Sequence, residues 1–293
     1  MTFRRFQFAM LALSLLAAAA GAASLGVFNL ELGIDFTGGS ILEAEYAGER
    51  PEVSEIRESL EGLALGSLTV QPAGEKGVLL RMKDIPEETH QEILFSLGEG
   101  AKELRFESVG PVIGRELREK TLVLAAFAIL AVVLYIAFAF RRTAEGIKPW
   151  HWSGAALIAS FHDILIPLGL FAFLGEYAGT QFTIPVVVAL LTVVGYSVND
   201  KVVVFDRIRE NLQKRVGFDF TDTVKQSLKQ TWVRSLSTSL TTVAVLLSIY
   251  LFGGSTLKDF ALMLMVGIAA GTFSSLFLAP SLLIIWRGGI PRL

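Results

Sequence analysis

Ionisable side chains inside long apolar stretches are the residues of this sequence that could do chemistry. His162 and Asp163 are neighbours near the middle of the apolar stretch 153–174. A charge at the centre of a membrane helix costs at least about 2.5–3.5 kcal/mol on insertion scales, so such a residue indicates a function. The pair could belong to a proton path, or it could be a polar pair hydrogen-bonded to a neighbouring helix. Its central position favours the proton path.

A second acidic residue, Asp200, follows Asn199 in the later half of the stretch 182–205. Tyr196 comes four residues earlier and therefore shares a helical face with Asp200. Lys201 is predicted to point elsewhere and to extend its flexible stem toward the membrane surface. Asp200 is therefore a candidate for reversible protonation.

A third polar cluster begins at Arg234, which has six hydroxyl side chains in the eight positions after it. Small hydroxyl residues allow close helix packing, which accounts for the serines and threonines but not for the arginine. Asp200 and Arg234 are expected at similar depths on neighbouring antiparallel spans, so the two could pair. We hypothesise a proton-controlled switch, with a static pair that fixes helix register as the alternative. The candidate proton-coupling residues are Asp200, Arg234, Asp163, His162 and Asn199.

The composition indicates a membrane protein that positions these residues on helices. Of 293 residues, 52% are hydrophobic and 18% charged, and the mean hydropathy is +0.55. A bilayer core about 30 Å thick needs roughly 20 apolar residues per helix. Pro280 predicts a tilt or kink in the last span, and Gly267 and Gly271 predict close packing there. An all-α bundle of six transmembrane helices is predicted, at 6–28, 121–140, 153–174, 182–205, 233–252 and 260–286.

The composition also limits the kinds of ligand that the chain is expected to bind. The net charge of −2 argues against nucleic acid as a partner. The chain has no cysteine, and none of its three histidines has metal-ligand spacing with another. We therefore expect no metal and no cofactor, with protons as the coupling ion.

The first span has a competing interpretation. Arg4 and Arg5 precede an apolar run that ends in alanine-rich sequence, as in a cleavable signal peptide. The uncharged run 6–30 is much longer than the usual apolar region of about 7–15 residues. An uncleaved span is favoured.

Lysine and arginine in the short loops predict the orientation. The side of the N-terminus carries thirteen of them and the opposite short loops carry only Lys258, so both termini are expected in the cytoplasm. The thirteen are Arg4, Arg5, Arg141, Arg142, Lys148, Arg207, Arg209, Lys214, Arg215, Lys225, Lys229, Arg287 and Arg292.

A hydrophilic segment, 29–120, separates the first span, 1–28, from the five spans of 121–293. It holds no nucleophile–base pair, metal cluster or phosphate loop, so an extracytoplasmic domain for contact and not an enzyme is expected. Its pattern predicts the order β-α-β-β-α-β, which is that of an α+β ferredoxin-like domain. The predicted strands are 40–46, 67–71, 77–82 and 103–108, and the predicted helices are 51–61 and 86–97.

The cytoplasmic loop 206–232 is basic and has apolar residues every fourth position from Phe220 to Trp232. This spacing predicts an amphipathic helix. Two interpretations stand equally, a helix lying on the inner membrane surface and an ordinary packed linker helix.

Several motifs in this order and topology are similar to those of the SecF family, and the resemblance covers essentially the whole chain. One of them, Gly33-Ile34-Asp35-Phe36-Thr37-Gly38-Gly39, is a turn-rich junction for which a structural role is expected. Lys201 departs from the small hydroxyl residue expected in many relatives, which could alter the electrostatics of Asp200. The other motifs are Val109-Gly110-Pro111, Phe161-His162-Asp163, Tyr196-Ser197-Val198-Asn199-Asp200-Lys201, Phe205-Asp206-Arg207-Ile208-Arg209-Glu210-Asn211 and Arg234-Ser235-Leu236-Ser237-Thr238-Ser239.

The resemblance implies more than the residues do. SecF-like proteins belong to the resistance–nodulation–division (RND) superfamily and pair with SecD, whose six spans complete a twelve-span unit. The pair assists the SecYEG translocon in the bacterial inner membrane, using the proton motive force to promote translocation of preproteins. SecD, SecYEG, a translocating preprotein and the lipid bilayer are the partners implied.

Three other functions fit parts of the sequence. Half of a proton-driven RND-type exporter of small molecules or lipids is disfavoured because a domain of about 90 residues is too small for an export tunnel. An intramembrane aspartyl protease would need Asp163 and Asp200 facing each other at one depth, whereas Asp200 is expected nearer the cytoplasm. A passive scaffold is the third, in which the buried charges need not titrate.

Overall fold

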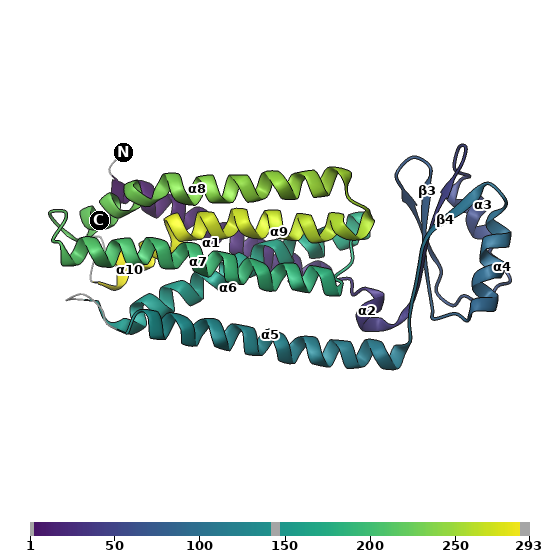
Figure 1. Ribbon diagram of the computed structural model, residues 1–293, viewed down its shortest axis with the longest axis horizontal. Helices are drawn as coiled ribbons and strands as arrows, with labels where there is room; N and C mark the ends of the chain where they lie inside the picture. The colour runs from purple at the N-terminus through teal and green to yellow at the C-terminus, as the bar shows by residue number, and fades with distance from the viewer. Residues whose placement is uncertain (1–2, 142–146, 288–293) are drawn as a thin grey trace. The chain divides into compact units, whose positions relative to one another are not determined.

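The computed structural model describes residues 3–141 and 147–287 (Figure 1). The chain divides into two compact units, one of Met1–Glu31 with Leu124–Leu293 and one of Leu32–Val123. In the described residues, six helices are long and apolar enough to cross a membrane. Their number and order confirm the six predicted spans.

The larger unit is a bundle of long helices (Figure 1). Each predicted span coincides with one helical segment, although most helices extend beyond the apolar run that predicted them. The helices are α1 Phe3–Phe28, α5 Pro111–Ala139, α6 Pro149–Ala178, α7 Ile184–Gln213, α8 Phe220–Phe252, and a last one composed of α9 Ser255–Phe273, a π-helix η1 Ser274–Leu278 and α10 Ala279–Trp286.

Small residues let the helix backbones approach closely. A Cβ added at Gly169 of α6 would lie 2.4 Å from Cα of Gly21 in α1, and Ser24 Oγ donates to Gly169 O at 2.7 Å. This fit of α1 supports the interpretation of the first span as part of the bundle. On α9, a Cβ at Gly267 would lie 2.3 Å from Val193 Cγ2 of α7, so the predicted packing glycines are used within the chain.

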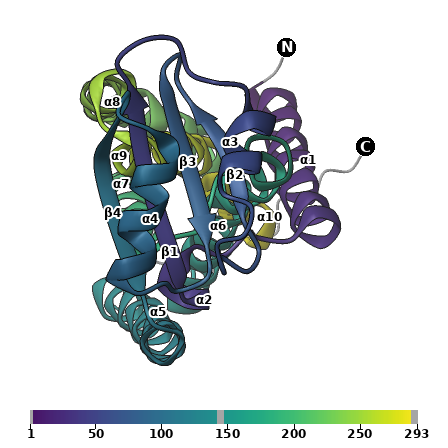
Figure 2. The same cartoon turned by 90° about the vertical axis from the view of Figure 1, so that its right-hand side faces the viewer.

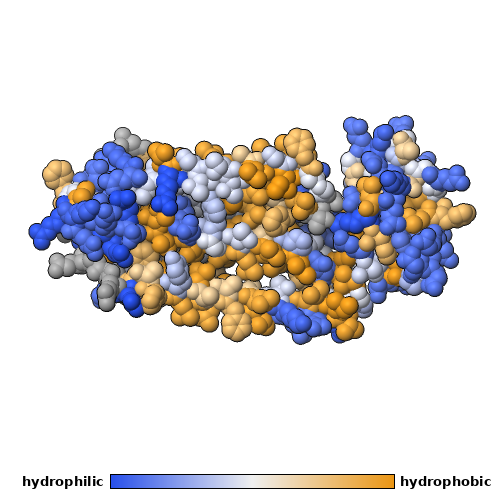
Figure 3. All heavy atoms as spheres, viewed as in Figure 1, coloured by the Kyte–Doolittle hydropathy of each residue, from blue (hydrophilic) through white to orange (hydrophobic). Residues whose placement is uncertain are grey.

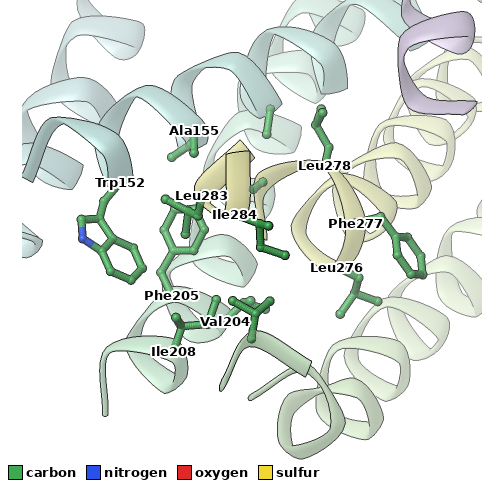
Figure 4. Packing of buried hydrophobic residues seen from close by; sticks show 14 of the residues in the cluster. Trp152, Ala155, Val204, Phe205, Ile208, Leu276, Phe277, Leu278, Leu283 and Ile284 are labelled. Atoms are coloured by element: carbon green, nitrogen blue, oxygen red, sulfur yellow. The ribbon is translucent and has the colours of Figure 1, made fainter. Parts of the chain in front are cut away.

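One of the two buried apolar clusters in the described part of the bundle includes Trp152 of α6 (Figure 4). Its indole packs edge to face against the ring of Phe205 at 5.2 Å, and Leu283 of α10 belongs to the same cluster. Apolar side chains also cover the middle of the long helices, and hydrophilic ones gather where α7 turns into α8 (Figure 3). Phe127 and Leu134 of α5 are more than half exposed, which suits contact with lipid.

The segment 206–232 is not a helix lying on the membrane surface, so that interpretation was wrong. It continues α7 to Gln213 and starts α8 at Phe220, so only a short turn separates two long helices. Asn211 Nδ2 donates to Ser227 Oγ at 2.8 Å and ties the two helices together. Val224 and Leu228 are buried in the bundle core, as the packed-helix interpretation requires.

The last span is interrupted by the π-helix η1, two residues before Pro280. Proline has no N–H to donate to the carbonyl four residues earlier, and its ring crowds that carbonyl. A π turn widens the helix at that point and is one of the recognised causes of helix distortion. The predicted kink at Pro280 is therefore a π-helical segment whose five residues are all buried.

The smaller unit contains one antiparallel sheet with strand order β2-β3-β1-β4 (Figure 2). Helices α3 and α4 cover one face of this sheet, and buried apolar residues such as Leu42, Leu80 and Ile93 form the core. The elements are a short helix α2 Ile34–Thr37, then β1 Gly39–Tyr46, α3 Val53–Ser59, β2 Thr69–Ala73, β3 Gly77–Met82, α4 Glu87–Leu97 and β4 Ala101–Val109.

The predicted order β-α-β-β-α-β is present, and the boundaries differ by a few residues. The second strand, predicted at 67–71, is shifted along the chain, because β2 continues through Pro72 to Ala73. β2 lies at the edge of the sheet and pairs only with β3. A proline without an N–H is tolerated on an edge strand, which explains why Pro72 does not end it.

Candidate functional site

Asp163 of α6 is the centre of a buried hydrogen-bond network. Its carboxylate is 1% exposed and accepts from three helices. Oδ1 lies 2.9 Å from His162 Nδ1, while Oδ2 lies 2.5 Å from Lys201 Nζ and 2.8 Å from Ser274 Oγ. Ser197 Oγ also donates to Oδ2. A buried carboxylate needs such donors to compensate for lost water.

Lys201 does not extend to the membrane surface, and that prediction was wrong. Its side chain is fully buried, and it forms an ion pair with Asp163. Ser197 and Lys201 are one helical turn apart on α7, so both side chains reach the same carboxylate of α6. Because both side chains reach Asp163, its carboxylate lies beside the turn of α7 that also contains Asp200.

Asp200 faces a different set of partners. Its Oδ1 accepts a hydrogen bond from Ser235 Oγ of α8 at 2.6 Å, and its Oδ2 accepts one from Ser275 Oγ of η1. Asp200 is half-buried, and Asn199 beside it is exposed. The hydroxyl of Tyr196 is buried and has no hydrogen-bond partner among the described residues.

Arg234 is exposed and makes no ion pair with Asp200 in the part of the chain that the structure describes. The expected pairing is therefore not formed in this arrangement. Neighbouring positions on a helix are about 100° apart around its axis, so Ser235 faces α7 and Arg234 does not. The hydroxyl-rich sequence that opens α8 thus supplies the contact to Asp200 through a serine.

The π-helix brings both carboxylates into contact with one segment. Consecutive residues Ser274 and Ser275 donate to Asp163 and to Asp200, respectively. Ser197 and Lys201 lie in the motif 196–201 but were not predicted to contact Asp163, and Ser274 and Ser275 were not singled out from the sequence. The signal for these two serines was a polar pair in an apolar helix shortly before Pro280, because a proline distorts the helix and π turns are frequent at functional sites.

His162 contacts Asp163 with one ring nitrogen, and its other nitrogen, Nε2, is buried without a partner among the described residues. The described residues contain no group of three or more histidine or acidic side chains that could hold a metal.

The segment 33–39 forms a compact junction in the smaller unit. Thr37 Oγ1 donates to Gly33 O at 3.1 Å, and Phe36 is buried. Gly38 has φ +76°, and a Cβ there would lie 2.7 Å from Pro111 Cα at the start of α5. Gly39 has φ +136° and is equally restricted. Only glycine adopts these backbone conformations without strain and leaves room for the neighbouring backbone. The two glycines therefore have a structural role at this junction.

Comparison with known families defines the class of protein. The family described as protein export membrane protein SecD/SecF, C-terminal, matches residues 89–289, and the SecD/SecF GG motif matches residues 23–48. The chain is thus a multi-pass membrane protein of the SecD/SecF class.

Comparison with individual relatives identifies the family within this class. The chain is 41% identical to protein translocase subunit SecF of Thermobaculum terrenum, over 97% of this chain and 93% of the relative. It is 39% identical to the SecF subunit of Anaerolinea thermophila, over 95% and 91%. The chain belongs to the SecF family of protein translocase subunits.

Solved structures agree with this assignment. The crystal structure of SecDF from Thermus thermophilus, a translocon-associated membrane protein, is 33% identical, with a TM-score of 0.85 over 98% of this chain. SecDF in its super-membrane-facing form gives a TM-score of 0.69 over the same share. The chain spans 38% and 39% of those SecDF chains.

Proposed function

We propose that this chain is an auxiliary subunit of the Sec translocase, which works with SecD and the proton motive force to promote preprotein translocation. The observation that carries the coupling is the pair of carboxylates, Asp163 and Asp200, held inside the bundle by consecutive serines of the π-helix. Protons are the coupling ion, and the mechanism needs neither a cofactor nor covalent chemistry.

Protonation of Asp200 changes what this residue can bind. The ionised carboxylate accepts hydrogen bonds from both Ser235 of α8 and Ser275 of η1. The neutral acid is a weaker acceptor and carries a donor of its own. A proton on Asp200 therefore loosens the attachment of α8 and of η1 to α7.

In the second state of the proposed switch, Arg234 lies beside Asp200. It comes one residue before Ser235, so a rotation of α8 by about 100° would exchange the serine for the arginine beside Asp200. The ion pair of Lys201 with Asp163 holds α6 and α7 together meanwhile. One charge that crosses 100 mV releases about 2.3 kcal/mol, enough to bias two states by more than tenfold.

The orientation rests on the distribution of basic residues. With thirteen lysines and arginines on one side and Lys258 opposite, both termini lie in the cytoplasm and the smaller unit lies outside a bacterial inner membrane.

The smaller unit is proposed to be a ferredoxin-like contact domain. Its β-α-β-β-α-β order and fully antiparallel sheet support that assignment. Its role is to hold SecD or a translocating preprotein. Exposed apolar residues of α5, such as Phe127, suit the lipid bilayer or a SecD helix, and the SecYEG translocon is the larger partner.

The test compares Asp200→Asn with Asp206→Asn. Both changes remove one carboxylate from α7, but Asp206 is 58% exposed and pairs with Arg209. Asp200→Asn should assemble with SecD and lose the gradient-dependent part of secretion, whereas Asp206→Asn should keep it. Full gradient-dependent secretion by an assembled Asp200→Asn complex would rule out the switch. Loss of assembly in that variant would point to the passive-scaffold alternative.

A further inference from the structure

A cavity of about 190 Å³ lies between the first turns of α1, the first third of α8 and the π-helix. Aromatic side chains and lysines line this space together. The lining residues are Phe3, Phe6, Gln7, Lys225, Leu228, Lys229, Trp232, Leu276 and Phe277.

The apolar part of this cavity has the shape and chemistry of a hydrocarbon site. The ring of Phe277 contacts Phe6 at 5.8 Å and Trp232 at 6.1 Å between centroids, in both cases edge to face. Trp232 is 42% exposed. Tryptophan favours the level of the lipid headgroups, because its ring is apolar and its N–H is polar.

The charged part consists of Lys225 and Lys229. The two residues are one helical turn apart on α8 and therefore lie on one face. Neither forms an ion pair with any residue that the structure describes, unlike Lys214, which pairs with Glu210 at 2.6 Å. Two ammonium groups beside an apolar cavity complement one anionic headgroup.

Gln7 supplies an independent sign of a ligand. Its side chain is 2% exposed, and Oε1 accepts a hydrogen bond from Ser281 Oγ at 2.9 Å. Its amide nitrogen, Nε2, has no hydrogen-bond partner among the described residues. A buried donor without an acceptor is costly and is seldom left so. A ligand oxygen at the cavity would accept from it.

We propose that this cavity binds an anionic phospholipid. The phosphate is held by Lys225 and Lys229, an ester or phosphate oxygen accepts from Gln7, and an acyl chain lies along Phe6 and Phe277. Basic pockets between membrane helices recognise anionic headgroups in this way. The site ties α1 to α8 and to the π-helix, and it is independent of whether Asp200 takes up protons.

Tryptophan quenching tests the proposal in the full chain. The protein is reconstituted in phosphatidylcholine vesicles that contain a small fraction of brominated phosphatidylglycerol or brominated phosphatidylcholine. Brominated phosphatidylglycerol should quench the fluorescence of Trp232 more strongly than brominated phosphatidylcholine at equal fraction. Trp232→Phe should remove that difference, because the other tryptophans do not line the cavity.

Charge variants separate this site from general surface attraction. Lys225→Gln with Lys229→Gln should weaken the apparent affinity for phosphatidylglycerol about tenfold or more, since each lysine contributes to headgroup binding. Lys148→Gln with Lys214→Gln removes the same charge from the same side but away from the cavity, and should change it less than twofold. Gln7→Leu should weaken binding without any change of charge.

Three results would overturn the proposal. These are equal quenching by the two brominated lipids, an equal loss of affinity in the two double variants, and quenching in Trp232→Phe that is as selective as in the parent chain. Circular dichroism of each variant confirms that the helices are intact, so that a loss of binding reports on the site.

Discussion

At the scale of single residues, the ion pair of Lys201 with Asp163 is the most consequential contact in the bundle. Both side chains are fully removed from solvent, and each charge needs the other because a lone buried charge is strongly unfavourable. Ser197 and Ser274 complete the carboxylate's hydrogen bonds. The pair fixes the level at which α6 and α7 meet and thus the geometry around Asp200.

Loss of one member of this ion pair should therefore destabilise the protein more than loss of both members. We expect Lys201→Met to lower the free energy of unfolding by about 3–5 kcal/mol, because it leaves a buried carboxylate without its counter-ion. The double change Lys201→Met with Asp163→Asn should recover most of that loss. Thermal unfolding in detergent measures both, and equal stability of the single and double variants would show that the pair is not coupled.

A residue of the smaller unit gives a pH dependence. The pKa of Glu87 is lowered by hydrogen bonds to its carboxylate, first from Gln91 and then from His90. A carboxyl whose pKa is lower in the folded state stabilises the fold above its unfolded value near 4.5, and that contribution is lost as the pH falls through the folded pKa.

The expected result is a difference between two titrations of stability. Unfolding of the isolated segment 32–116, followed from about pH 7 to pH 3, should show a steeper loss of stability at acidic pH than in Glu87→Gln. Glu92→Gln is the control on the same helix. Parallel curves for the parent and Glu87→Gln would mean that Glu87 has the same pKa in both states.

At the scale of elements, helix packing depends on glycine in one place and not in another. A Cβ at Gly267 would lie 2.3 Å from Cγ2 of Val193, a stiff and fully buried side chain. Gly195 of α7 has open space around its position. The two glycines therefore predict opposite responses to alanine.

We expect Gly267→Ala to destabilise the protein by about 1–3 kcal/mol through overpacking. Gly195→Ala should be neutral or stabilising by up to about 1 kcal/mol, because alanine favours the helix. Val193→Ala should partly rescue Gly267→Ala by vacating the contact. Chemical unfolding in detergent gives the stability of each variant, and an equal effect of the two glycine variants would contradict the close contact of α9 with α7.

The elements also show what a sequence can and cannot predict. Apolar length predicted the six spans well, because burial in lipid constrains composition over about 20 residues. Partners between helices were harder to predict. Lys201 was predicted to reach the membrane surface because lysines in membrane helices generally do so. Its buried partner, Asp163, lies on a different helix, and the sequence does not show which residues of α6 and α7 meet. Likewise, a rotation of about 100° decides that Ser235 and not Arg234 meets Asp200.

At the scale of the whole molecule, the two units have separate cores. The smaller unit buries its own apolar residues between the sheet and two helices, and the bundle buries another set around Trp152. Gly39 and Val109 are paired at one end of β1 and β4, so the chain enters and leaves the sheet at adjacent positions. This arrangement allows the sheet and its two covering helices to be removed while the residues on either side stay close together.

The last prediction uses this geometry. Deletion of 40–108 leaves Gly39 and Val109, whose Cα atoms are about 5 Å apart as antiparallel partners, so two glycines can join them. The contact of Gly38 with Pro111 is retained. The bundle should keep its thermal stability and its assembly with SecD, whereas the secretion benefit should be lost because the contact domain is gone. Insertion of the same two glycines after Gly74, an open turn between β2 and β3, is the matched control and should leave secretion intact. Normal secretion by the deletion variant would show that the bundle alone performs the function.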